Sequence, residues 1–183
     1  MPLIRSLRPN VTRDEAIRVF SRGAWGVIQS SISGPLRSVA EFYVPFQLYR
    51  VEISNRRKRE NRCLGLDAVT GSLDLYHFEQ LPTEREIICR ESRNSIRPRL
   101  DEIEAAELLR AKVGRMLFSS GFFRIHNLEI RVEPLQGEIH IPYWVGFRGR
   151  DRHARLVVLD AVRRRIEGAK LRQLLEAWLT SVD

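Results

Sequence analysis

Two aspartates at matching places in the chain are the first residues whose type and spacing could support chemistry. Asp67 lies in the run LDAV at 66–69, and Asp160 lies in an identical run at 159–162. Two carboxylates that meet in a cleft can share one proton and activate water for hydrolysis. Aspartates of this kind also close turns by accepting backbone N–H hydrogen bonds. We favour the turn interpretation and keep a hydrolase with an Asp67/Asp160 dyad as a remote alternative.

No other motif of catalysis or metal binding is visible. The chain has no phosphate-binding glycine loop, no dinucleotide fingerprint and no G-x-S-x-G nucleophile motif. Its histidines stand singly, without the helical i, i+4 spacing of metal ligands: His77, His126, His140 and His153. Cys63 and Cys89 lack C-x-x-C spacing, so we interpret them as ordinary buried thiols. We therefore expect no catalytic residue, no metal and no cofactor.

Basic residues form the second group with a possible function. The formal net charge is +8, and all but three of the 31 basic residues are arginine. Two predicted hairpin tips and one turn carry basic clusters that could straddle a phosphate backbone: Arg56, Arg57, Lys58 and Arg59; Arg148, Arg150, Arg152 and Arg155; and Arg163, Arg164 and Arg165. Nucleic-acid binding is thus an alternative function. We favour a solvated surface, because the arginines are interleaved with 23 acidic residues along the chain.

An internal repeat positions these groups. The segment YVPFQLY at 43–49 is echoed by HIPYWVG at 140–146. Pro45 and Pro142 are 97 residues apart, whereas Asp67 and Asp160 are 93 apart, so the two copies differ by four residues between these points. Such length changes are tolerated at hairpin tips. The chain is therefore predicted to contain two related units.

Each predicted unit begins with a helix followed by strands. Thr12 and Glu15 form a capping box at the start of the first helix, and Pro98 precedes the second, which ends at Gly121. Alternating patterns predict strands at 36–53, 62–78, 122–133, 136–148 and 153–162. A final amphipathic helix is expected at about 168–181.

These elements predict an α+β fold made of two tandem, related helix-plus-antiparallel-sheet units with a C-terminal amphipathic helix. The first repeat is expected at 1–80 and the second, which includes that helix, at 101–183. Residues 81–100 contain two prolines and many charges and are predicted to form the linker.

The first repeat resembles a PepSY-type domain. The resemblance is carried by TRDEAI at 12–17, LYRVEI at 48–53 and LGLDAVTGSL at 64–73, and it covers most of this repeat. The second repeat is a more degenerate copy, with Arg163–Arg165 in place of the Thr-Gly turn. PepSY-type domains pair a short helix with an antiparallel sheet. The resemblance implies a non-catalytic, extracytoplasmic module that regulates peptidases.

The N-terminus and the hydropathy indicate location. Arg5, Arg8 and Arg13 interrupt the apolar run that a signal peptide requires, and no run of uncharged apolar residues is long enough to span a membrane. We therefore expect a bacterial-type, cytoplasmic protein of 183 residues without a membrane anchor. The most favoured function is a regulatory or protein-interaction module. Leftover strand edges or the C-terminal helix would bind a protein partner or a second copy as a homodimer.

Overall fold

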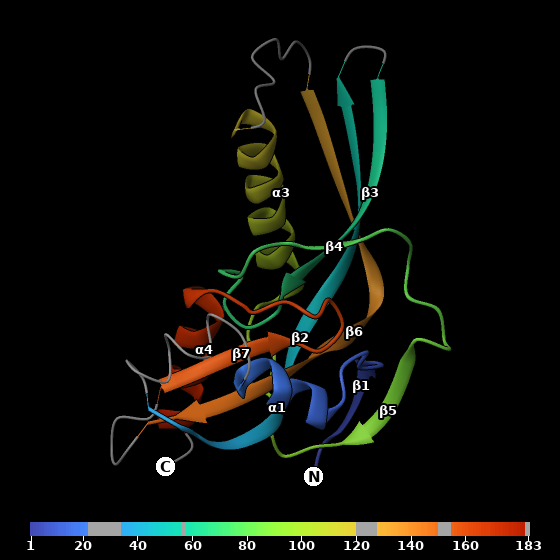
Figure 1. The fold of residues 1–183 in the computed structure, drawn as a ribbon. Coiled ribbons are helices and arrows are strands. Elements are labelled where there is room, and N and C mark those ends of the chain that lie inside the picture. Colours follow the sequence, from blue (N-terminus) through green and yellow to red (C-terminus); the bar gives the residue numbers. More distant parts are fainter. Residues whose placement is uncertain (22–33, 56–57, 120–127, 150–154, 182–183) are drawn as a thin grey trace. The chain divides into compact units, whose positions relative to one another are not determined.

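The computed structural model describes residues 1–21, 34–55, 58–119, 128–149 and 155–181 (Figure 1). In chain order the elements are β1 (Leu3–Leu7), α1 (Arg13–Ser21), β2 (Leu36–Asn55), β3 (Lys58–Asp67), β4 (Tyr76–Phe78), β5 (Ile87–Glu91), α3 (Glu102–Ser119), β6 (Leu128–Arg148), β7 (Arg155–Asp160) and α4 (Ala169–Ser181). The predicted α+β class and the C-terminal helix are confirmed. None of these described helices is both long and apolar enough to cross a membrane.

The described strands form one mixed sheet in the order β4-β3-β2-β6-β1-β5, with β7 also paired to β6. Two antiparallel hairpins dominate it. In the first, β2 and β3 pair without interruption from Phe46↔Asp67 to Asn55↔Lys58. In the second, β6 and β7 pair from Tyr143↔Asp160 to Arg148↔Arg155. Both hairpins therefore end in an aspartate that marks the last residue of its strand.

The chain divides into two compact units that interleave along the sequence. Unit 1 comprises Met1–Val44, Ile88–Ile96 and His140–Asp183, and unit 2 comprises Pro45–Ile87 and Arg97–Ile139. This division differs from consecutive repeats at 1–80 and 101–183 with a linker at 81–100. The physical reason is that each helix packs against a hairpin that is remote from it in the sequence.

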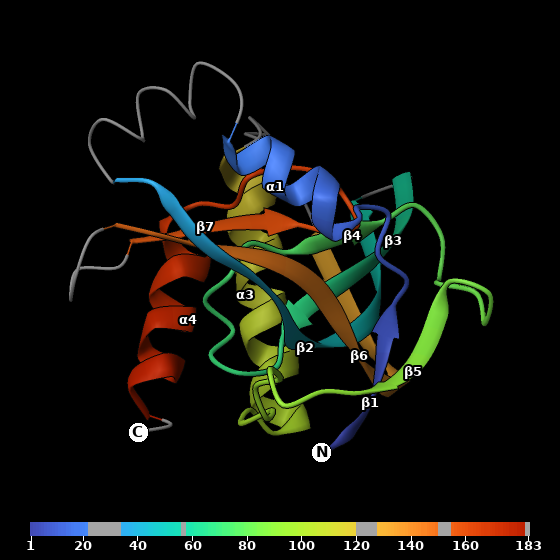
Figure 2. The ribbon, with the colours of Figure 1, turned by 60° about the horizontal axis from the view of Figure 1, so that its bottom comes forward.

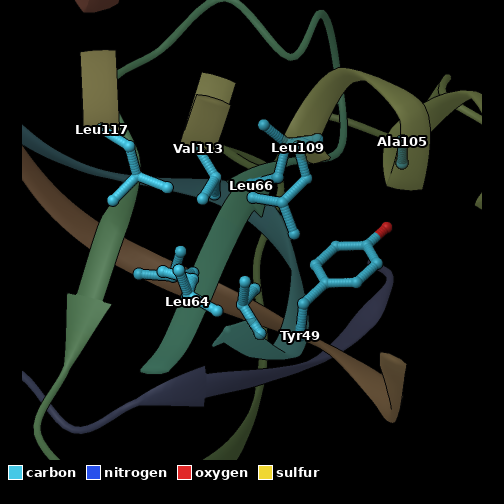
Figure 3. Close-up of a cluster of buried hydrophobic side chains, with 9 residues drawn as sticks. Tyr49, Leu64, Leu66, Ala105, Leu109, Val113 and Leu117 are labelled. Carbon is cyan, nitrogen blue, oxygen red and sulfur yellow. The ribbon is translucent and has the colours of Figure 1, made fainter. Parts of the chain in front are cut away.

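Unit 2 is built by helix α3 on the β2–β3 hairpin. Apolar residues along one side of α3 pack against alternate residues of the two strands, and the side chains meet in Figure 3. The buried cluster comprises Tyr49, Val51, Ile53, Leu64, Leu66, Ala105, Leu109, Val113 and Leu117. Burying each of the larger aliphatic side chains contributes about 1.5–3 kcal/mol.

Unit 1 is built by helix α1 on the β6–β7 hairpin. The shared cluster comprises Val11, Ala16, Phe20, Val39, Trp144, Val157, Leu159 and Ala161. The predicted capping box starts α1, since the Thr12 amide donates to Glu15 Oε2 at 2.8 Å and the Glu15 amide donates to Thr12 Oγ1 at 3.3 Å. Helix α4 lies beside β7 (Figure 2), and its Trp178 ring meets Phe42 edge-on at 4.8 Å.

Several predicted boundaries are wrong for identifiable reasons. The strands predicted at 122–133 and 136–148 are one strand from residue 128 onward, because Gly137 adopts a positive φ of 91° without ending the pairing pattern. The single strand predicted at 62–78 is two strands, β3 and β4, separated by the turn after Asp67. Strand β1 was not predicted, and β5 lies inside the predicted linker.

Candidate functional site

Asp67 closes the turn that follows β3. Its side chain is fully buried, and its Oδ1 accepts hydrogen bonds from the amides of Thr70 at 2.8 Å and Gly71 at 3.0 Å. Its Oδ2 accepts a third bond from the Leu73 amide at 2.8 Å. Three backbone donors and a fully engaged carboxylate are typical of a structural turn aspartate. Both oxygens of Asp67 are therefore committed within its own turn.

Glycine is required in this turn. Gly71 has a φ of +63°, a conformation that side chains with a Cβ adopt only at a cost. A Cβ at this position would also lie 2.8 Å from Leu108 Cδ1. The predicted role of Gly71 as the residue with positive φ is confirmed.

Asp160 closes the corresponding turn after β7, with fewer donors. Its Oδ1 accepts from the amides of Val162 and Arg163, each at 2.8 Å. Its Oδ2 is buried and has no hydrogen-bond partner among the described residues. Burial raises the pKa of the Asp160 carboxyl above its ordinary value, against the lowering effect of the two amides. Arg164 takes the place of glycine here, with a φ of 60°.

The two turns are tied to their hairpins in the same way. The residue after each aspartate donates its amide to the carbonyl oxygen of a strand proline: Ala68 to Pro45 at 2.9 Å, and Ala161 to Pro142 at 3.0 Å. Proline lacks an N–H but keeps a carbonyl acceptor, so it fits this position of the strand. The residues paired by sequence comparison thus make equivalent contacts.

These contacts decide between the interpretations of the aspartates. The turn interpretation is confirmed for both, because each carboxylate accepts backbone N–H bonds from the residues that follow it. Asp67 belongs to unit 2 and Asp160 to unit 1. A hydrolytic dyad needs two carboxylates that share a proton, and the geometry within each turn supplies no support for it.

The predicted basic sites are only partly described. Arg56, Arg57, Arg150 and Arg152 lie outside the described residues, whereas Lys58 opens β3 opposite Asn55. Arg59 is 80% exposed, and its Nε lies 3.8 Å from Glu52 Oε1. Exposed ion pairs of this length contribute little to stability. Arg59 therefore stays available to an anionic ligand.

The basic turn after β7 is occupied by internal contacts. Arg164 Nη2 donates to the Asn10 carbonyl oxygen at 2.6 Å and lies 3.9 Å from Glu15 Oε1. Arg165 Nε lies 3.0 Å from Glu167 Oε1. Arg163 donates its amide to Asp160 and is half-buried. The backbone and carboxylate contacts of Arg163, Arg164 and Arg165 support a structural role.

Arg148 does not lie at an exposed tip as predicted. Its side chain is 3% exposed, and its Nη2 donates to the Phe20 carbonyl oxygen at the end of α1. Its Nη1 reaches the Gly34 carbonyl oxygen at 3.4 Å. A cation at a helix C-terminus is favourable because the last carbonyls carry partial negative charge. Arg148 is thus a helix-capping residue of the core.

The remaining titratable residues show no metal arrangement. The part of the chain that the structure describes holds no group of three or more His, Cys, Asp or Glu side chains placed to bind a metal. His140 is buried, and burial lowers its pKa. Cys63 is half-buried, as expected, but Cys89 is exposed on β5, so its predicted burial is wrong. His126 and His153 lie outside the described residues.

A polar cluster that sequence reasoning missed fastens β5 to β2. Arg90 and Glu41 form a two-point ion pair, Nη2–Oε2 at 3.0 Å and Nη1–Oε1 at 3.3 Å. The Arg90 guanidinium carbon lies 5.2 Å from the centre of the buried Tyr43 ring, and burial raises the pKa of that phenol. The repeated spacing E-x-(Y/H)-x-P at 41–45 and 138–142 was the available signal.

Comparison with known proteins gives no family for this chain: no family model, no curated protein and no solved structure matches it. The functional argument therefore comes from the geometry of the chain itself.

Proposed function

We propose that the protein is a non-catalytic protein-interaction module that binds a second protein chain along the outer edge of β5. The supporting observation is the position of β5 at the end of the strand order, where β1 is its one strand neighbour in the described sheet (Figures 1 and 2). An edge strand offers a row of N–H and C=O groups to an incoming strand.

The residues of β5 favour this use of its edge. The strand IICRE is five residues long and contains neither proline nor lysine, two of the residues that guard sheet edges. Cys89 and Glu91 are exposed, and the isoleucines are half-buried. The other end of the strand order is β4, which is only three residues long. Thus β5 is the longer of the two terminal strands.

The second surface considered, the C-terminal helix, is already used within unit 1. Its apolar residues Leu171, Leu174 and Leu175 are buried, and Trp178 packs against Phe42. A helix that buries its apolar side within its own chain has little left to offer a partner. This packing supports β5 over α4 as the binding surface.

The partner that we propose first is a second copy of the chain. Two β5 strands can pair around a two-fold axis, which is the commonest symmetry of soluble oligomers. Antiparallel pairing with Cys89 opposite its counterpart places each Arg90 across from a half-buried Ile88. The PepSY-type resemblance implies a regulatory role of the same non-catalytic kind.

Light scattering coupled to size exclusion tests the proposal. Cys89→Lys places a charge on the outer edge, and Ile103→Lys is the matched control because Ile103 is an exposed residue of α3, away from the sheet edge. The wild type and Ile103→Lys are expected to show a mass above one chain, and Cys89→Lys is expected to elute as a monomer. A monomeric wild type, with no protein partner whose binding Cys89→Lys weakens, would contradict the proposal.

Nucleic-acid binding is the second candidate, supported by the net charge of +8 and the exposed Arg59. Fluorescence anisotropy with short DNA and RNA tests it between about 50 and 200 mM salt, where phosphate-driven binding weakens steeply. Binding with that salt dependence, reduced by Arg59→Glu, would place this function first. No binding at the lower salt concentration would remove it.

A further inference from the structure

Each hairpin holds a helix that is preceded by the same short motif. Residues 5–12 read RSLRPNVT and residues 94–101 read NSIRPRLD. Both contain S-(L/I)-R-P, one variable residue, an apolar residue and a helix-capping residue. The two copies are 89 residues apart, and α1 and α3 follow them directly. The motif therefore extends the internal repeat to the segments in front of the helices.

The two motifs make equivalent contacts with a strand. Ser6 is the parallel bridge partner of His140 on β6, and Ser95 is the parallel bridge partner of Tyr43 on β2. His140 and Tyr43 each stand two residues before the proline of their strand. The same serine of the motif thus meets the same strand position in both cases.

The motifs also make equivalent contacts with the aspartate turns. The Asn10 amide donates to the Ala161 carbonyl oxygen at 2.7 Å, and the Arg99 amide donates to the Ala68 carbonyl oxygen at 2.8 Å. Ala161 and Ala68 each follow a turn aspartate. The segment before α1 is therefore held by the second hairpin, and the segment before α3 by the first.

The facing side chains match each helix to one hairpin by size. Phe20 of α1 and Leu109 of α3 are equivalent, as are Gly146 and Tyr49 on the strands. A Cβ at Gly146 would lie 2.9 Å from Phe20 Cδ2, so the large ring sits on the smallest residue. In the other unit Leu109 shares a buried cluster with Tyr49. Exchanging the helices would overpack one hairpin and leave a cavity in the other.

We propose that the β6–β7 hairpin is a docking surface for residues 3–21 of a second copy of this chain, which gives a dimer by segment exchange. The page of contacts is identical whichever copy supplies the segment, because Asn10 and Ala161 are already remote in sequence. The covalent link contributes only effective concentration, on the order of 1 mM for a short flexible connection. This proposal adds a second mode of self-association to the proposed function and does not use β5.

Disulfide trapping between full-length chains tests the exchange. Cys63→Ser and Cys89→Ser remove the natural thiols, and Asn10→Cys and Val162→Cys are then made in separate chains. These positions are close, since Asn10 Nδ2 donates to the Val162 carbonyl oxygen at 3.0 Å. Mixing the two chains at about 1 mM under mild oxidation is expected to give a covalent heterodimer, because the second copy then competes with the chain's own segment.

Two controls make the result decisive. A single chain with both Asn10→Cys and Val162→Cys is expected to close an intrachain disulfide, which checks the geometry. Val69 is the counterpart of Val162 on the other hairpin, and Asn10→Cys mixed with Val69→Cys is expected to give at most a tenth of the heterodimer, because Phe20 does not fit over Tyr49.

Failure of the matched pair to link while the double variant closes would overturn the exchange. Equal yields from the matched and mismatched pairs would overturn the size rule. Cys89→Lys in place of Cys89→Ser removes pairing at the β5 edge and is expected to leave this cross-link unchanged. Loss of the β5 dimer and loss of the segment exchange are therefore distinguishable.

Discussion

The turns after Asp67 and Asp160 have the same backbone and different side-chain chemistry. Gly71 and Arg164 adopt φ values of +63° and 60° at equivalent positions, and each donates its amide to the carbonyl oxygen of its turn aspartate, at 3.2 and 3.0 Å. The Asp67 carboxylate is fully engaged, whereas the Asp160 carboxylate keeps one buried oxygen without a described partner. The aspartate and the strand pairing thus define the turn, and the Thr-Gly sequence improves it.

The arginine in the second turn offsets part of its own cost. A residue with a Cβ in the left-handed region loses about 1–2 kcal/mol relative to the right-handed conformation. The Arg164 guanidinium donates to the Asn10 carbonyl oxygen at 2.6 Å, and such a charge-assisted bond contributes about 1.5–3 kcal/mol when it is well protected. The second turn is therefore tied to the segment before α1, which the first turn does not require of its glycine.

Removing each carboxylate is expected to give the largest difference between the turns. Asp67→Ala leaves three backbone N–H groups without their carboxylate acceptor and should lower the free energy of unfolding by about 3 kcal/mol or more. Asp160→Ala leaves two such groups and removes the unpartnered oxygen, so a loss of about 1–2 kcal/mol is expected. Urea unfolding followed by circular dichroism measures both. Equal losses would show that the donor count does not set the stability of the turns.

Substitution at the residue with positive φ should give a smaller difference. Gly71→Ala introduces a Cβ in the left-handed region and against Leu108, so a loss of about 1–2 kcal/mol is expected. Arg164→Gly relieves the backbone cost but removes the bond to Asn10, so the net change is expected within about 1 kcal/mol of zero. Thermal unfolding of both variants tests this. A larger loss for Arg164→Gly than for Gly71→Ala would reverse the comparison.

The pH dependence of the Asp160 turn sharpens the comparison further. Burial raises the pKa of Asp160 above 3.8, so the folded state holds the proton more tightly than the unfolded state. The resulting stabilisation is present below the unfolded-state pKa and is lost as pH rises through the folded-state pKa. Asp160→Asn should therefore become more favourable relative to the wild type as pH rises from about 3 to 8. Urea midpoints that differ by a constant amount across this range would contradict the burial argument.

Local signals predicted much of this structure. The capping box at Thr12 and Glu15, the turn glycine Gly71 and the C-terminal helix each depend on residues within a few positions of one another. The repeat itself was visible because the LDAV runs and the strand prolines are short, matched patterns. These features follow from turn chemistry, capping and periodicity.

The missing parts depend on contacts between remote residues. Strand β1 pairs with β6 through Ser6 and His140, and no local pattern announces that partner. Arg148 was predicted at an exposed tip because arginines are usually solvated, but the end of α1 covers it. The packing of each helix on the hairpin of the other repeat follows from the complete fold. A comparison of residues 5–12 with 94–101 was the sequence signal for it.

Hydrogen–deuterium exchange of the β5 amides, compared between dilute and concentrated protein, tests the proposed interaction edge most directly. Pairing with a second copy is expected to slow exchange across Ile87–Glu91 as concentration rises, while the exposed turn at Thr83–Glu86 keeps its rate. Protection of β5 that does not change with concentration, in a sample whose mass shows association, would mean that the chains meet elsewhere and would contradict the account.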